Sequence, residues 1–205
     1  MEMILFQIVI LLFSVVIHEI SHGFMAERFG DDTARRMGRL TLNPIKHIDP
    51  IGSILVPIVL AALGGVVFGW AKPVLYNPRN LKNPERDSMF IALAGPISNI
   101  TIAVVFGILF RVLTISSLAI SNISSVIILI SFIIQINIVL AVFNLLPIPP
   151  LDGSRVLFTL LPRSAQKIRI MFEKYGFLIL VAFIFLGFDF LFPIMEFLFH
   201  IITGA

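Results

Sequence analysis

Hydrophobic positions along this chain fall into long unbroken runs, not into the short alternating or amphipathic patterns of a soluble domain. Four runs, residues 3–25, 51–70, 89–110 and 123–146, are each long enough to cross a bilayer as a helix, which takes about 20 apolar residues. A fifth run, residues 176–202, contains acidic residues and a proline, so it predicts either one long broken helix or two helices. The pattern predicts an all-α polytopic membrane protein.

The second run, residues 51–70, differs from the others because the basic residues argue against a single crossing. Of the 15 Lys and Arg residues, all but Arg111 lie between positions 28 and 86 or between positions 155 and 174. The positive-inside rule places both blocks in the cytoplasm, yet one crossing by this run would split the first block between the two sides. We therefore expect a re-entrant or partly extended segment, which leaves three core transmembrane helices and one or two C-terminal helices.

Composition narrows the class of protein further. Hydrophobic residues make up 58% of the 205 residues and no linker divides them, so we expect a single membrane domain over residues 1–205. No cysteine is present, so any transition metal must be held by nitrogen and oxygen atoms. The net charge of +3 comes without a basic stripe interleaved with aromatic residues. The lipid bilayer is therefore an expected partner, and nucleic acid is not.

The first run carries the sequence His18-Glu19-Ile20-Ser21-His22, an H-E-x-x-H pattern. Two histidines four residues apart lie on one face of a helix, so both imidazoles can reach one metal ion, and Glu19 projects beside them toward the catalytic water. Ionisable groups are costly inside a bilayer and are rarely kept there without a use. The pattern predicts a zinc site within the membrane.

A catalytic zinc ion needs a third protein ligand, and Asp152 is the best candidate. It follows a proline-rich break at residues 147–150, at the membrane boundary. The ligands of one metal must lie at the same depth in the membrane. His18 lies toward the basic end of its apolar run and Asp152 lies just before the second basic block, so both belong near the cytoplasmic face. A single crossing by residues 51–70 would put Asp152 at the opposite face, so this run is again expected to re-enter. Four acids in charged loops are interpreted instead as solvated surface: Asp31, Asp32, Glu85 and Asp87.

Two further motifs make this arrangement more specific. One is Gly95-Pro96-Ile97-Ser98-Asn99, and the other runs from Asn144 to Gly153 with the spacing N-x-x-P-x-x-x-L-D-G. Together with H-E-x-x-H, they resemble the site-2 protease family of intramembrane zinc metalloproteases, over residues 3–160. The chain is most similar to the minimal prokaryotic branch of that family, which lacks PDZ and CBS domains.

The resemblance implies that Zn²⁺ is held by His18, His22 and Asp152, and that Glu19 acts as general base and acid. It also implies that Asn99 offers an amide N–H to the substrate carbonyl or oxyanion. The implied reaction is hydrolysis of a peptide bond in a transmembrane protein substrate, near the cytoplasmic face of the cell membrane. Such a multi-pass enzyme would act in regulated intramembrane proteolysis.

Several alternatives stay open. Asn99 could pack helices together, as polar residues commonly do in membranes. Asn137 and Asn144 are seven residues apart on one helical face, and we expect them to hold the Asp152 loop, to meet the substrate, or to pack helices. A metal-binding transporter or channel would use the same buried ligands. A proteolytically inactive scaffold homologue would keep the fold, although it would not need the intact ligand set.

Overall fold

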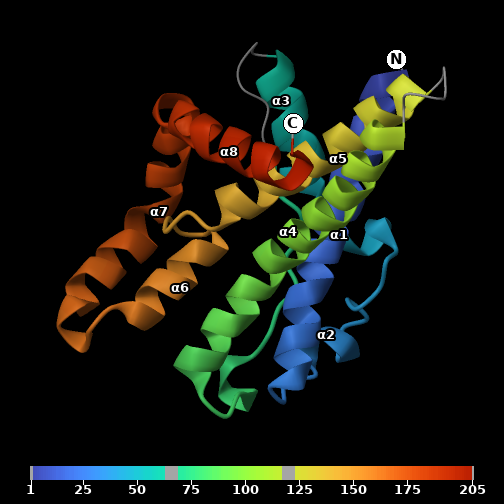
Figure 1. Cartoon of the computed structure of the whole chain (residues 1–205). Helices are drawn as coiled ribbons and strands as arrows, with labels where there is room; N and C mark the ends of the chain where they lie inside the picture. The colour runs from blue at the N-terminus through green and yellow to red at the C-terminus, as the bar shows by residue number, and fades with distance from the viewer. Residues whose placement is uncertain (1, 63–68, 117–122, 205) are drawn as a thin grey trace.

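The computed structural model describes residues 2–62, 69–116 and 123–204, and within these ranges the regular structure is entirely helical (Figure 1). Its helices are α1 (Glu2–Arg28), α2 (Thr33–Arg36), α3 (Val56–Ala62), α4 (Pro84–Ser116), α5 (Ile123–Asn144), α6 (Asp152–Leu160), α7 (Gln166–Leu186) and α8 (Phe192–Thr203). Three of them, α1, α4 and α5, are long and apolar enough to cross a membrane. The predicted all-α membrane fold with a three-helix core is confirmed.

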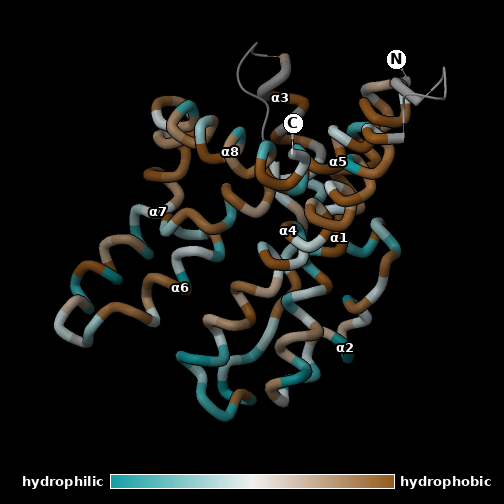
Figure 2. Tube along the Cα trace, in the orientation of Figure 1, coloured by the Kyte–Doolittle hydropathy of each residue, from teal (hydrophilic) through white to brown (hydrophobic). Residues whose placement is uncertain are grey.

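Helix α4 lies at the centre of this core and packs against α1, α5 and α6. Buried apolar side chains of α4 and α5, such as Ala103, Ile134 and Ile138, form one cluster with Leu191 and Met195 from the C-terminal region. Figure 2 shows the hydrophobic residues concentrated along these helices and the hydrophilic residues gathered at the end where α2 lies. The core therefore fixes the relative positions of the segments that carry the predicted chemistry.

The two ends of the second apolar run lie together. The Trp70 N–H donates to the Gly52 carbonyl at 3.1 Å, and the Ser53 hydroxyl donates to the Trp70 carbonyl at 2.8 Å. A π-helical turn (Pro50–Leu55) and α3 lead away from this point, and an irregular segment without helix or strand, residues 69–77, leads back. The turn itself, at residues 63–68, lies outside the described residues. The run therefore does not cross as a single helix. This agrees with the prediction made from the basic residues.

The C-terminal run forms two helices. Helices α7 and α8 are separated by a short 3₁₀ turn (Phe188–Leu191) and bend by 78° relative to each other. At the end of α8, the Arg111 side chain of α4 donates from Nε to the Ile202 carbonyl at 2.9 Å. A cation at a helix C-terminus satisfies carbonyls that have no partner inside the helix. Arg111 is thus used at the opposite end of α4 from the other basic residues.

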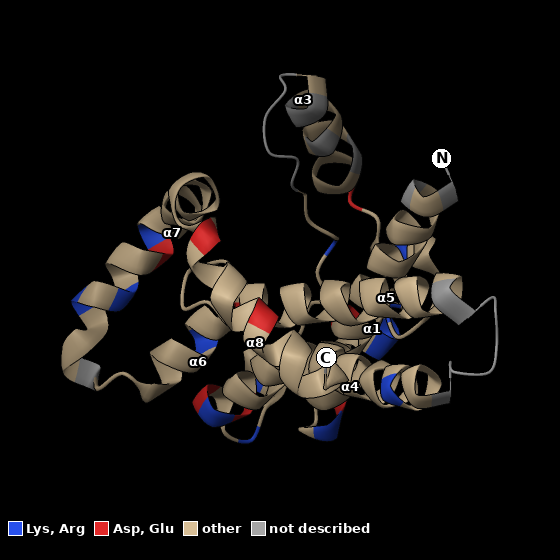
Figure 3. Ribbon diagram, turned by 45° about the horizontal axis from the view of Figure 1, so that its top comes forward, with Lys and Arg blue, Asp and Glu red and all other residues tan. Residues whose placement is uncertain are grey.

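The basic blocks lie at the end of the bundle where α1 ends and α4 begins, together with the α6–α7 region (Figure 3). Two acids there correct the sequence interpretation, because Asp31 and Asp87 are fully buried and not solvated. Asp31 accepts hydrogen bonds from the Asn77 N–H at 2.7 Å and the Asn80 amide at 2.6 Å. Burial alone would raise the pKa of Asp31, but hydrogen bonds from Thr33, Asn80 and Asn77 hold that pKa below its usual value.

Candidate metal centre

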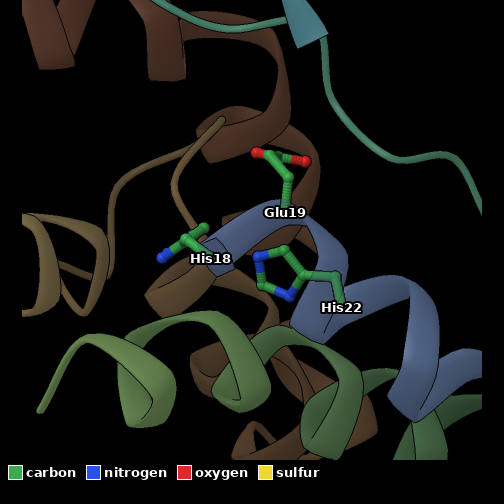
Figure 4. Close-up of side chains that lie close together, drawn as sticks. All are labelled: His18, Glu19 and His22. Carbon is green, nitrogen blue, oxygen red and sulfur yellow. The ribbon is translucent and has the colours of Figure 1, made fainter. Parts of the chain in front are cut away.

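Helix α1 presents His18, Glu19 and His22 together, as Figure 4 shows. One ligand-type atom from each of the three side chains lies within 4.8 Å of the others. Both histidines are buried, and Glu19 is only partly buried. The i, i+4 spacing therefore places both imidazoles on one face of α1, as the H-E-x-x-H pattern predicts.

Asp152, the first residue of α6, reaches both imidazoles. Its Oδ2 atom lies 3.1 Å from His18 Nε2 and 3.2 Å from His22 Nε2. Gly153 allows this approach, because a Cβ atom at that position would lie 2.1 Å from the Leu145 carbonyl oxygen. The start of α6 can thus pack directly on the end of α5, and the structure brings all three sequence-predicted ligands to one point.

The hydrogen bonds behind the two rings test whether these residues fit a metal. His22 Nδ1 lies 2.6 Å from the Ile91 carbonyl oxygen, which can only accept, and His18 Nδ1 lies 2.6 Å from Asn99 Oδ1. In a neutral imidazole, a proton on Nδ1 leaves Nε2 as a bare lone pair. Two lone pairs and a carboxylate oxygen then face one another with no hydrogen between them. A cation resolves this repulsion, and nitrogen and oxygen donors of this kind suit zinc.

Glu19 is arranged differently from the three converging residues. Its Oε2 atom accepts the backbone N–H of Val74 at 2.7 Å, within the irregular segment 69–77, which we call the strap. The buried Arg39 side chain holds the strap in place by donating to the Lys72 carbonyl at 2.8 Å and to the Pro73 carbonyl at 3.1 Å. This geometry favours Asp152 as the third ligand and leaves the Glu19 carboxylate beside the centre, where a general base belongs.

Helix α4 approaches the two imidazoles closely at Gly95. A Cβ atom at this position would lie 2.5 Å from Nε2 of both His18 and His22. The next residue, Pro96, lies inside the helix and removes one of its backbone hydrogen bonds. Only a glycine leaves room for the ring nitrogens at this contact. The glycine of the Gly95–Asn99 motif therefore shapes the metal centre itself.

Replacing Gly95 with alanine is therefore expected to displace both rings and to lower zinc affinity by about 10- to 100-fold, the usual cost of disturbing ligand orientation. Metal content after dialysis against a graded chelator measures this loss. The matched control is Gly107→Ala in the same helix, where the new methyl group would crowd Ile202 instead of the histidines. Wild-type zinc affinity in Gly95→Ala would contradict the predicted contact.

The structure brings Asn99 to the centre, but on the Nδ1 side of His18. Its Nδ2 atom donates to Asn137 Oδ1 at 2.8 Å, and Asn99 is completely buried. The predicted oxyanion role would require this amide to leave Asn137, and it stays a prediction. Asn137 is linked to the centre through Asn99, whereas the amide of Asn144 donates to the Leu140 carbonyl at 2.9 Å, on its own helix.

Two contributors were missed by the sequence interpretation. Ser14 lies one helical turn before His18 and accepts a hydrogen bond from the Asn137 amide at 3.0 Å. Its signal was available, because a serine four residues before His18 in an apolar run lies on the same helical face. Val74 contributes only its backbone N–H, for which no side-chain pattern exists. His47 is also buried, and its carbonyl accepts the Lys72 N–H of the strap at 2.9 Å.

Comparison with known proteins gives independent matches. The model of peptidase family M50 matches residues 6–124 and 111–187. YwhC of Bacillus subtilis, which carries the name of a zinc metalloprotease, is 38% identical over 180 residues, covering 86% of this chain and 78% of YwhC. Rip2 of Mycolicibacterium smegmatis, named in the same way, is 34% identical over 171 residues, covering 83% of this chain and 63% of Rip2. No solved structure matches the chain significantly.

Proposed function

Because this chain belongs to peptidase family M50 and is a membrane-integral zinc metalloprotease, we propose that it hydrolyses peptide bonds of transmembrane substrates near the cytoplasmic face of the cell membrane. The observation that carries the proposal is the convergence of His18, His22 and Asp152 within a core of membrane-length helices, with Glu19 beside them. A soluble substrate would not reach metal ligands that lie inside a membrane-spanning core. The proposed enzyme is one domain over residues 1–205.

In the proposed mechanism, His18, His22 and Asp152 would hold the zinc ion. When bound, zinc polarises the scissile carbonyl and lowers the pKa of the attacking water. Glu19 accepts a proton from that water and returns it to the leaving amine. Because Oε2 of Glu19 takes the Val74 N–H, Oε1 is the oxygen that carries the proton. The strap thereby orients the carboxylate while one oxygen stays available.

The depth of the centre supports cleavage near the cytoplasmic face. His18 lies seven positions before residue 25, where the first apolar run ends, which corresponds to about 10 Å along a helix, and fifteen positions after residue 3, where that run begins. The basic residues that follow Arg28 support a cytoplasmic location of this end by the positive-inside rule. A substrate helix must unwind locally to be cut there, because its backbone carbonyls are hydrogen-bonded and shielded.

The proposal is tested with a single-span protein labelled at both ends and reconstituted with the enzyme in sealed vesicles. We expect one cut, mapped by mass spectrometry to the cytoplasmic half of the span, that stops with a zinc chelator and returns with added zinc. The same vesicles, loaded with a metal-sensitive dye, test the transporter alternative. Zinc flux without cleavage would overturn the protease proposal, and zinc binding with neither activity would favour an inactive scaffold.

A further inference from the structure

We propose that Asn99, oriented by Asn137 and Ser14, is a positioning residue that fixes the proton of His18 on Nδ1 and thereby keeps Nε2 available for the metal. This inference rests on the proposed ligand set. It gives Asn99 a role that differs from substrate binding, since Asn99 would act through His18. It also gives the buried polar residues of α5 and of the first half of α1 a part in the reaction.

The contacts form a continuous chain across three helices. His18 Nδ1 and Asn99 Oδ1 lie 2.6 Å apart, and Asn99 Nδ2 donates to Asn137 Oδ1 at 2.8 Å. Asn137 Nδ2 in turn donates to Ser14 Oγ at 3.0 Å and to the Ile133 carbonyl at 2.9 Å. The side chains belong to α1, α4 and α5, and all of them are buried.

The far end of this chain determines the direction of every hydrogen bond in it. The Ile133 carbonyl can only accept, so the amide group of Asn137 must point toward it. Asn137 therefore offers its oxygen to Asn99, which must present its own amide group in return. That choice leaves the Asn99 oxygen facing His18 Nδ1. Because an amide oxygen only accepts, the proton of a neutral His18 must sit on Nδ1.

Reversing any one of these groups would leave buried donors or acceptors unpaired, which is costly where water is excluded. An Asn99 flip would place an amide group against His18 and an oxygen against the oxygen of Asn137. The second contact of the Asn99 amide, 3.4 Å from the Ser14 carbonyl oxygen, opposes the same flip. The network is thus self-consistent in one orientation only.

The two histidines differ in what holds their protons. His22 donates from Nδ1 to a backbone carbonyl, that of Ile91, which no side-chain substitution removes. His18 depends on a side chain, and ligating histidines usually need such an acceptor to keep their tautomer and ring orientation. Of these two acceptors, the Asn99 oxygen is the one that substitution can remove. Its loss can move the His18 proton from Nδ1 to the metal-facing Nε2.

The experiment compares Asn99→Leu with Asn99→Asp in the full-length protein. Leucine removes the acceptor at similar size, whereas a protonated aspartate keeps an oxygen facing His18 and can replace the amide donor to Asn137 Oδ1 with its O–H. Nitrogen-15 NMR of histidine-labelled, metal-free protein reports the tautomer, and chelator competition reports zinc affinity. We expect His18 to carry Nδ1–H in wild type and Asn99→Asp, and Nε2–H in Asn99→Leu. Zinc affinity in Asn99→Leu should fall by about 10- to 100-fold.

The matched control is Thr101→Val, which removes an exposed hydroxyl that donates to the Ile97 carbonyl of its own helix. It should change neither the tautomer nor the affinity. If Asn99→Leu does not fold, Asn137→Leu releases the orientation of the Asn99 amide and should shift part of His18 to Nε2–H. Retention of Nδ1–H and of wild-type affinity in the folded variant overturns the inference. Failure of the wild type to bind zinc would instead overturn the ligand set.

Discussion

Replacing Glu19 with glutamine is expected to abolish peptide-bond hydrolysis while zinc stays bound. Glutamine matches the shape of glutamate but cannot accept a proton from the attacking water, and general acid–base catalysis contributes about 10²- to 10⁴-fold to rate. Its amide oxygen can still accept the Val74 N–H, so the contact between α1 and the strap survives. We expect kcat/KM to fall by about 10³-fold or more, measured on a reconstituted single-span substrate.

A second glutamate on the same helix provides the control. Glu27 lies two turns further on and pairs with Arg35 at the surface, where the Arg35 Nη2 atom donates to it at 2.8 Å. Glu27→Gln should hydrolyse the substrate at the wild-type rate. Metal analysis of both variants should give wild-type zinc content. Turnover within tenfold of wild type in Glu19→Gln would assign the base to another group, and zinc loss in that variant would make Glu19 a ligand.

Replacing Asp152 with asparagine is expected to remove both zinc and activity, whereas Glu19→Gln is expected to remove activity alone. Asparagine keeps the size of the side chain but removes the negative charge that faces the two Nε2 atoms at 3.1 and 3.2 Å. Two imidazoles alone make an incomplete site, because catalytic zinc is generally held by three protein ligands. We expect zinc affinity to fall by about 100-fold or more, measured by competition with a chelator.

Asp189 offers the control for this change, because it is an exposed acid in the turn between α7 and α8. Asp189→Asn should keep full zinc content. Loss of zinc from Asp189→Asn, with none from Asp152→Asn, would refute the assignment of the third ligand. The contrast with Glu19→Gln separates the group that holds the metal from the group that moves the proton.

Features with a local physical cause could be predicted from the sequence. Helical periodicity places His18 and His22 on one face, and the length of the apolar runs predicts the three core helices. The requirement that His18 and Asp152 share one depth predicted the return of residues 51–70, which the Trp70–Gly52 hydrogen bond bears out. In each case a constraint along the chain was enough, without knowledge of how helices pack.

Features that depend on the register between helices could not be predicted in this way. The contact of Gly95 with both imidazoles depends on how far α4 is shifted along α1. The Asn99–Asn137 hydrogen bond requires α5 to be rotated toward that same level. The burial of Asp31 follows from residues 77–80 folding back onto the end of α1, so a charged loop composition gave the wrong environment.

The proposed ligands lie far apart in the sequence, and this separation links the supply of zinc to the lifetime of the protein. His18 and Asp152 are separated by 134 residues along the chain, so a shared ion would clamp the start of α6 to α1. At free zinc 1,000-fold above Kd, binding to the folded state alone would add about 4 kcal/mol to the free energy of unfolding. A cell short of zinc would therefore hold fewer copies of this protease as well as less active ones, because chains without the clamp would be exposed to degradation.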